Sequence, residues 1–239
     1  KLSTALFVCR SGSGSGGAPF VVRTHMGRQI EPASPSVRLT SADILRFDGD
    51  NVSILTCSQR DWDIASRIVA SSRVMRLGDY CRAYQGEVNE TTDGKRGFVS
   101  YKVKDGPEIL RGANICLYAL REASQGEAIY LRETKFLEGK PDSEKARHHE
   151  HPRIGWQESS AQNNFRRIIA APIPAERYCN HKINYLPAPE ISLEFDLVLA
   201  LLNSVIYDWF FRLTSTSASV SHYQIVKLPA PTLVDSPKI

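Results

Sequence analysis

One stretch near the end of the chain restricts the possible folds more than any other: LEFDLVLALLNSVIYDWFFRL, residues 193–213. Its apolar residues fall on almost every side of a helix, as is typical of a helix packed between other elements. Ser192 is a candidate N-cap, and Glu194 would lie in the first turn, where the helix dipole favours a negative charge. The stretch predicts one long buried helix whose aromatic residues belong to the core, not to a base-stacking surface: Tyr207, Phe210 and Phe211.

Two polar residues within this stretch, Asn203 and Ser204, are expected to hydrogen-bond neighbouring backbone groups. The serine-rich stretch TSTSASVS then ends the helix. HYQIVKLPAP (222–231) follows as a predicted closing strand, and Pro229 and Pro231 restrict such a strand to a sheet edge.

Short β-rich segments with glycine turns precede the helix. They are LGDYCRAYQGEV (77–88), GFVSYKV (97–103), ANICLYAL (113–120), EAIYLRETKFL (127–137), RRIIAAPIP (166–174) and KINYLPA (182–188). Together with the helix they predict an α+β fold, with short mixed or antiparallel strands packed around a long buried C-terminal helix.

The N-terminal region has a different pattern. ALFVCR (5–10) and PFVVRT (19–24) are predicted antiparallel strands joined by a glycine-serine loop. That loop contains G-x-G-x-x-G at Gly12, Gly14 and Gly17, but a β-branched run follows it where a nucleotide-binding turn requires a helix. A hairpin loop is therefore the preferred interpretation.

A connecting helix is predicted next, because Ser58 and Asp61 have the spacing of a capping box ahead of an apolar helical face. The shorter stretch TSADILRF (40–47) predicts a helical turn before it. We accordingly expect an N-terminal piece over 1–55, a connecting helix within 56–76 and a second domain over 77–239.

Composition limits the class of protein. A chain of 239 residues with 42% hydrophobic content can bury a core, and its net charge of +4 is compatible with a polyanionic partner without requiring one. The five cysteines are scattered and form no C-x-x-C pair, which favours a reducing cytoplasm over a disulfide framework. The longest apolar run, 197–202, is too short to cross a membrane. Because Lys1 is not a natural start, we expect a piece of a longer polypeptide.

Two metal hypotheses arise from the sequence. The cluster RHHEH (147–151) is dense in possible ligands, but H-x-H supplies two at most, so a solvated basic loop is the preferred interpretation. The second hypothesis is a magnesium nuclease, in which Glu133 and Lys135 form an E-x-K motif on a strand opposite Asp105. E-x-K is a frequent tripeptide, and an alternating charged strand produces it routinely.

The polar stretch WQESSAQNNFRR (156–167) has a composition suited to DNA readout. Amide side chains offer a donor and an acceptor to adenine edges, and arginine can bind guanine with two hydrogen bonds. Polar linkers have the same composition, so the surrounding sequence has to decide between the two interpretations.

From about Leu77 to Pro231 the chain resembles the C-terminal target-recognition domain (TaqI-like specificity domain) of adenine-specific DNA methyltransferases, notably those of type IIG restriction-modification enzymes. The resemblance is carried by LGDYCRAYQGEVN with Gly86, EILRGANICLY with Gly112, RRIIAAPIP, NHKINYLP, and LVLALLNSVIYDWFFR followed by a serine-rich loop and IVKLPAP. The chain departs from the family in having no NPPY-type catalytic tetrapeptide.

The resemblance implies that this segment recognises duplex DNA for a catalytic domain that lies mostly outside it. Methylation of a base requires its extrusion from the duplex, so a second module must hold the flanking DNA. S-adenosylmethionine is then the expected cofactor of the parent enzyme, with none in this segment, and the expected partners are duplex DNA and the methyltransferase domain, whose terminal hairpin would be 5–24. We expect no membrane partner. The predicted DNA-binding residues are Gln85, Asn89, Lys95, Arg96, Lys102, Lys104, Arg147, Arg153, Gln157, Gln162, Asn163, Asn164, Arg166 and Arg167.

Two alternatives stay open on sequence grounds. One is the magnesium nuclease that uses Asp105, Glu133 and Lys135. The other is a protein-interaction specificity subunit, for which a large exposed apolar face over 193–213 would be the deciding observation.

Overall fold

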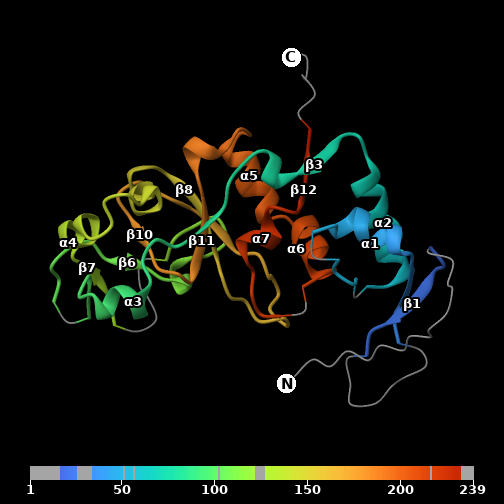
Figure 1. The fold of residues 1–239 in the computed structure, drawn as a ribbon, viewed down its shortest axis with the longest axis horizontal. Helices are drawn as coiled ribbons and strands as arrows, with labels where there is room; N and C mark the ends of the chain where they lie inside the picture. The colour runs from blue at the N-terminus through green and yellow to red at the C-terminus, as the bar shows by residue number, and fades with distance from the viewer. Residues whose placement is uncertain are drawn as a thin grey trace. The chain divides into compact units, whose positions relative to one another are not determined.

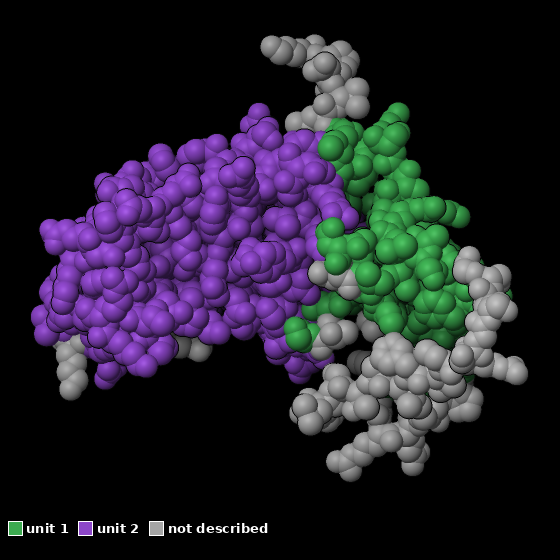
Figure 2. All heavy atoms as spheres, in the orientation of Figure 1, with its two compact units in different colours: residues 1–75, 212–217, 229–239 green, residues 76–211, 218–228 purple. Residues whose placement is uncertain are grey.

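The computed structural model describes residues 17–25, 34–50, 52–55, 57–101, 103–121, 127–215 and 217–232. The chain divides into two compact units (Figure 2). Unit 1 comprises the chain up to Met75, the segment Arg212–Ser217 and the chain from Pro229 onward, whereas unit 2 comprises Arg76–Phe211 and Ala218–Leu228. Unit 2 therefore begins one residue before the predicted boundary at Leu77, but it is not one continuous domain to the end of the chain.

Unit 1 contains a strand pair and two helices. Strands β1 (Phe20–Arg23) and β2 (Ser36–Leu39) are antiparallel, with Phe20 opposite Leu39. The predicted strand over 19–24 is thus present as β1. Its predicted partner, 5–10, lies outside the described residues, as do Gly12 and Gly14.

The helices of unit 1 are α1 (Ser41–Asp48) and α2 (Gln59–Ala70), and both begin with a capping box. In α2 the backbone N–H of Asp61 donates to Ser58 Oγ at 3.2 Å, and the backbone N–H of Ser58 donates to Asp61 Oδ2 at 3.2 Å. Trp62 is buried on the helix face that the sequence predicted. The prediction of this helix and of its capping pair is confirmed.

A second small strand pair joins distant parts of the chain. Strand β3 (Val74–Arg76) pairs with β12 (Pro229–Pro231). The closing strand is therefore present, but it is shorter than predicted, because His222–Ile225 form the helical turn α7.

The centre of unit 2 is an antiparallel four-stranded sheet in the order β4-β11-β8-β9, whose two middle strands, β11 and β8, are labelled in Figure 1. These strands are β4 (Tyr84–Gln85), β8 (Arg153–Gln157), β9 (Ala170–Ile173) and β11 (Ile183–Pro187). Every residue of β11 is buried, which explains its nearly continuous apolar sequence INYLP. At Gly155 of β8 a Cβ would lie 2.3 Å from the end of the Ile173 side chain, so a larger residue there would force that side chain to move.

Two smaller strand pairs and several short helices complete this end of unit 2, where α3, α4, β6, β7 and β10 gather in Figure 1. Strand β5 (Val99–Ser100) is antiparallel to β7 (Tyr130–Leu131), and β6 (Ile109–Leu110) is parallel to β10 (Tyr178–Cys179). The α-helices at this end are α3 (Glu90–Lys95) and α4 (Glu133–Glu138). Unit 2 as a whole also contains the 3-10 helices η1 (Leu77–Asp79), η2 (Gly112–Asn114), η3 (Glu144–Glu150) and η4 (Ala188–Glu190).

The long apolar stretch forms two helices, not one. Helix α5 (Phe195–Leu202) and helix α6 (Val205–Arg212) are separated by Asn203 and Ser204. The side chain of Asn203 hydrogen-bonds the backbone of Ala170 with both of its amide atoms, at 3.0 and 2.9 Å, and Ser204 Oγ accepts the backbone N–H of Tyr207 at 3.1 Å. The predicted backbone contacts of these two residues are therefore present, and they coincide with the break in the helix.

Three further details of the prediction are wrong. The E-x-K motif begins helix α4, and so it does not lie on a strand. Ser192 does not cap α5; its Oγ donates to the backbone oxygen of Tyr80 at 3.0 Å, and α5 begins three residues later. The RHHEH cluster lies largely within the 3-10 helix η3, and His148 and His149 in it are buried instead of solvated. At the level of fold class, the mixture of helices and small, mainly antiparallel sheets agrees with the α+β prediction.

Candidate nucleic-acid interface

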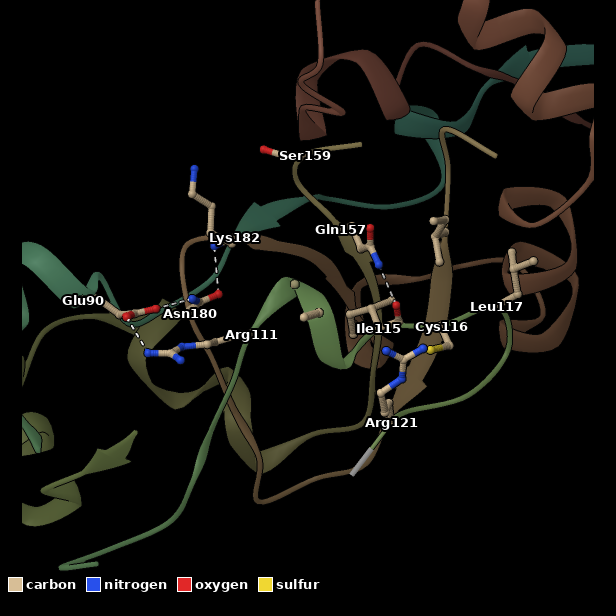
Figure 3. A pocket seen from close by; sticks show the side chains of 13 residues that line it. Glu90, Arg111, Ile115, Cys116, Leu117, Arg121, Gln157, Ser159, Asn180 and Lys182 are labelled. Atoms are coloured by element: carbon tan, nitrogen blue, oxygen red, sulfur yellow. Dashed lines mark hydrogen bonds and ion pairs between the residues drawn. The ribbon is translucent and has the colours of Figure 1, made fainter. Parts of the chain in front are cut away.

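A pocket of about 920 Å³ opens in unit 2 beside the central sheet (Figure 3). Its wall consists of the start of α3, the η2 segment with the loop that follows it, the end of β8, and the chain around the start of β11. The polar residues of the wall are Glu90, Arg111, Arg121, Gln157, Ser159, Asn180 and Lys182, and the larger apolar residues are Ile115, Leu117 and Ile169.

One side of this pocket is held by a chain of polar contacts, of which Figure 3 draws those between Asn180, Glu90 and Arg111 as dashed lines. Asn180 donates its amide N–H to Glu90, and the other oxygen of Glu90 forms an ion pair with Arg111 at 3.1 Å. Arg111 also donates to the backbone oxygen of Glu127 at 2.9 Å. These side chains are fixed by the protein itself, so they shape the pocket before any ligand enters.

The position of Asn180 depends on Gly86, which the sequence marks in the first β segment. A Cβ on Gly86 would lie 1.9 Å from the backbone oxygen of Asn180, well inside any tolerable contact. Gly86 also donates its backbone N–H to Ile183 at 2.7 Å. The absence of a side chain therefore lets two backbone segments approach closely at the edge of the pocket.

The opposite wall presents Gln157, the last residue of β8. Its Nε2 donates to the backbone oxygen of Ile115 at 2.7 Å, and no described residue hydrogen-bonds its Oε1. An amide oriented in this way offers an acceptor at a fixed position. Gln157 is the one residue of the predicted DNA-binding set that lines this pocket.

Two cations of the pocket remain accessible to a ligand. Arg121 is exposed, and its guanidinium has no partner among the described residues. The side chain of Lys182 is 53% exposed and lies 3.3 Å from Glu158. Burial alone would raise the pKa of Glu158, but hydrogen bonds from Ser159 and Lys182 lower it, so Glu158 is ionised and balances part of the lysine charge.

A twelve-residue loop, 158–169, leaves the pocket wall and returns to β9. Its base is paired with the segment 218–220: Ser160 donates its N–H to Ala218 at 2.9 Å, and Val220 donates to Glu158 at 2.7 Å. Its tip, 161–165, is exposed and includes Gln162, Asn163 and Asn164, while Phe165 is 91% exposed. The loop thus combines an anchored base with a projecting tip.

Two predicted contact residues are buried, which corrects the prediction for them. Arg153 has 0% exposure and forms a closed ion pair with Glu87 at 2.9 Å. Arg167 has 1% exposure, lies 5.3 Å from the ring centre of Phe211 and donates to the backbone oxygen of Ser219 at 3.3 Å. Their charges are used inside the protein, so neither is placed to meet DNA.

The other predicted residues come from several separate segments of the chain, and most of them are exposed. Gln85, Lys95, Arg96, Lys104 and Arg147 are exposed, Asn89 and Arg166 are half-buried, and Lys102 lies outside the described residues. Asn89 caps helix α3 by accepting the backbone N–H groups of Thr91 and Thr92. Arg96 donates to the backbone oxygen of Gly139, and Arg147 is paired with Glu150 at 3.6 Å.

The sequence interpretation missed the basic residues of the pocket, Arg111, Arg121 and Lys182. Two of them flank the segment ANICLYAL, and the third begins KINYLPA. In the sequence they are isolated charges at the ends of apolar segments. Ordinary surface residues occur at the same positions, so this pattern does not indicate a site.

Both carboxylates of the nuclease hypothesis have other partners in the part of the chain that the structure describes. Asp105 pairs with Arg132 at 2.6 Å, and Glu133 accepts the hydroxyl of Tyr178 at 2.8 Å. Among those described residues the single three-ligand group of His, Cys, Asp or Glu lies elsewhere, at Glu144, His148 and Glu190.

No protein-family model matches the chain, and no curated protein matches it. Within the described part of the chain, every helix is too short or too polar to cross a membrane.

Proposed function

We propose that unit 2 is a DNA-recognition module of the kind that holds duplex DNA for an adenine-specific methyltransferase. The observation that carries the proposal is that one pocket is lined both by two accessible cations, Arg121 and Lys182, and by the fixed amide of Gln157. Cations provide attraction to phosphate that does not depend on sequence, and a fixed amide acceptor can discriminate among base edges.

The loop 158–169 adds to this support. It starts at the pocket wall, and its exposed tip presents three amide side chains beside an exposed aromatic ring, Phe165. Two of the sequence segments that resemble target-recognition domains contribute to the pocket wall: EILRGANICLY contributes residues from Arg111 to Leu117, and NHKINYLP contributes Asn180 and Lys182. The proposal assigns the methyltransferase domain and its S-adenosylmethionine to the parent enzyme. The recognised bases are those of the duplex that this enzyme binds.

The test is binding of the full chain to a random fluorescent duplex, measured by anisotropy across a salt series. We expect binding that weakens as salt rises, and a loss of roughly tenfold or more in Arg121→Glu/Lys182→Glu at low salt. The matched control is Arg60→Glu/Arg67→Glu, which changes the net charge equally at exposed positions of α2 that are neither in the pocket wall nor among the predicted DNA-binding residues.

Binding that is undetectable at low salt, or that does not respond to salt, would refute the proposal. Equal losses in the two double variants would mean that total charge, not this pocket, governs the affinity. Neither alternative function gains a specific observation. Asp105 and Glu133 are each bound to another side chain, and within 193–213 the exposed apolar residues of the described chain are Ala200, Val205 and Ile206.

A further inference from the structure

Three possible metal ligands, none of which lines the pocket, converge in unit 2. Glu144 and His148 belong to the 3-10 helix η3, and Glu190 is the last residue of η4, which follows strand β11. One ligand atom from each lies within 4.8 Å of the other two. Two carboxylates that approach each other so closely repel unless a proton or a cation lies between them.

His148 provides an independent reason to expect a ligand. Its side chain is only 6% exposed, and its Nδ1 lies 3.1 Å from the hydroxyl of Tyr185. Its Nε2 is buried, has no hydrogen-bond partner, and lies 3.8 Å from Glu190 Oε1, which is too long for a hydrogen bond. A buried ring nitrogen without a partner costs free energy, and a bound metal ion would remove that cost.

The surrounding tyrosines hold two of the three ligands in place. The hydroxyl of Tyr84 donates to both oxygens of Glu190, at 3.0 and 2.9 Å, and its ring packs edge-on against His148 with the ring centres 4.6 Å apart. The hydroxyl of Tyr185 fixes the orientation of the imidazole from the other side. Outer hydrogen bonds of this kind are usual around metal ligands, because they fix the orientation of the ligand.

We propose that Glu144, His148 through Nε2, and Glu190 bind one divalent transition-metal ion, with Zn²⁺ as the best match. An imidazole ligand favours zinc over magnesium and calcium, which prefer oxygen donors alone. Glu144 is exposed and has no partner among the described residues, so its carboxylate is able to close on the ion. With three protein ligands, water would complete the coordination.

The bound ion would link η3 to the end of the central sheet. His148 and Glu144 come from the segment before β8, whereas Glu190 follows β11, so the ion would connect two segments about forty residues apart in sequence. The proposal therefore concerns the stability of unit 2, and it does not depend on DNA binding.

The experiment uses the full chain after removal of metal with a chelator. Isothermal titration with ZnCl₂ should give one site that depends on these ligands, and thermal unfolding should shift to higher temperature with Zn²⁺ but not with equal MgCl₂. Glu144→Gln, His148→Gln and Glu190→Gln should each weaken zinc binding at least tenfold. Tyr84→Phe keeps all three ligands but removes the hydrogen bonds that orient Glu190, so it should also weaken zinc binding, by roughly 10-fold to 100-fold.

His151→Gln is the matched control, because this exposed histidine directly follows η3 and is not one of the three ligands. Glu144→Gln changes an exposed side chain, so it keeps the test valid if the His148 variant fails to fold. The proposal is overturned if zinc neither binds nor raises the unfolding temperature, or if Glu144→Gln and His148→Gln bind zinc as tightly as the unchanged protein.

Discussion

Arg153 and Glu87 form an ion pair that is closed to solvent at both ends. Both side chains have 0% exposure, and the pair is held by further contacts: Glu87 Oε1 accepts the backbone N–H of Cys179 at 3.0 Å, and Arg153 donates to the backbone oxygen of Arg177. The guanidinium also lies 5.0 Å from the ring centre of Tyr185. Burial of a charge costs free energy, so each of these two charges is tolerated inside the protein only because the other one lies beside it.

Removal of one partner should therefore be severe. We expect Glu87→Gln to lower the free energy of unfolding by about 3–5 kcal/mol, because it leaves the charge of Arg153 buried without compensation. The double variant Glu87→Leu/Arg153→Met should recover only part of that loss, because the backbone N–H of Cys179 and the backbone oxygen of Arg177 lose their partners. Urea unfolding followed by tryptophan fluorescence measures both.

The control for this prediction is the exposed pair of Arg147 and Glu150, whose side chains are 54% and 50% exposed. Glu150→Gln should change the unfolding free energy by less than about 1 kcal/mol. A loss in Glu87→Gln no larger than that of the control would mean that water reaches Arg153.

At the scale of elements, Asn203 connects the break between α5 and α6 to the edge of the central sheet. Strand β9 is the last strand of that sheet, and its residue Ala170 donates to Asn203 Oδ1 at 3.0 Å. Asp208 of α6 accepts the backbone N–H of Ile168 at 3.0 Å, just before the same strand. Side chains from the helices thus satisfy backbone groups that an edge strand would otherwise leave unpaired.

Asn203→Leu should separate these effects. The leucine favours a helix and suits the buried position, but it leaves the Ala170 N–H without an acceptor, so we expect a loss of about 1–3 kcal/mol in the free energy of unfolding. Ser204→Ala, next to it and half-buried, should cost less. Guanidinium unfolding of both variants gives the comparison, and a stabilised Asn203→Leu would show that the helix break has no role in holding β9.

How far the sequence predicts these elements depends on whether their signal is local. The capping box of Ser58 and Asp61 placed α2 correctly, because both partners lie within one turn. The break at Asn203 was missed because its partner, Ala170, lies 33 residues away. The candidate site was harder to predict than the elements. Sequence alone does not distinguish an arginine that binds a buried glutamate from one that faces solvent, so Arg153 was assigned to the surface and Arg121 was overlooked.

At the scale of the whole molecule, the chain leaves unit 2 after Phe211 and returns to it for residues 218–228. The returning segment is built into the unit: Val220 is fully buried, and its backbone oxygen accepts hydrogen bonds from Trp156 Nε1 and Asn184 Nδ2, both at 3.0 Å. At the end of the returning segment, the backbone oxygen of Leu228 accepts the backbone N–H of Leu77 at 2.8 Å. The sequence does not predict that the chain leaves unit 2 and returns to it, because each element involved has the pattern of an ordinary helix, loop or strand.

Truncation tests the importance of the returning segment. A chain that ends after Leu213 should lose the cooperative unfolding of unit 2, because Trp156 and Asn184 would keep buried donors without acceptors, at about 1–3 kcal/mol each, and the apolar contacts of Val220 and Ile225 would be lost as well. Those losses approach the whole stability of an ordinary domain, which is about 5–15 kcal/mol. A chain that ends after Thr232 retains every one of these contacts and should unfold like the full protein. Thermal unfolding followed by near-ultraviolet circular dichroism compares the two, and a peptide of residues 214–232 added to the shorter chain should restore part of the lost signal. If the shorter chain unfolds cooperatively at an unchanged temperature, the segment lies on unit 2 without supporting it.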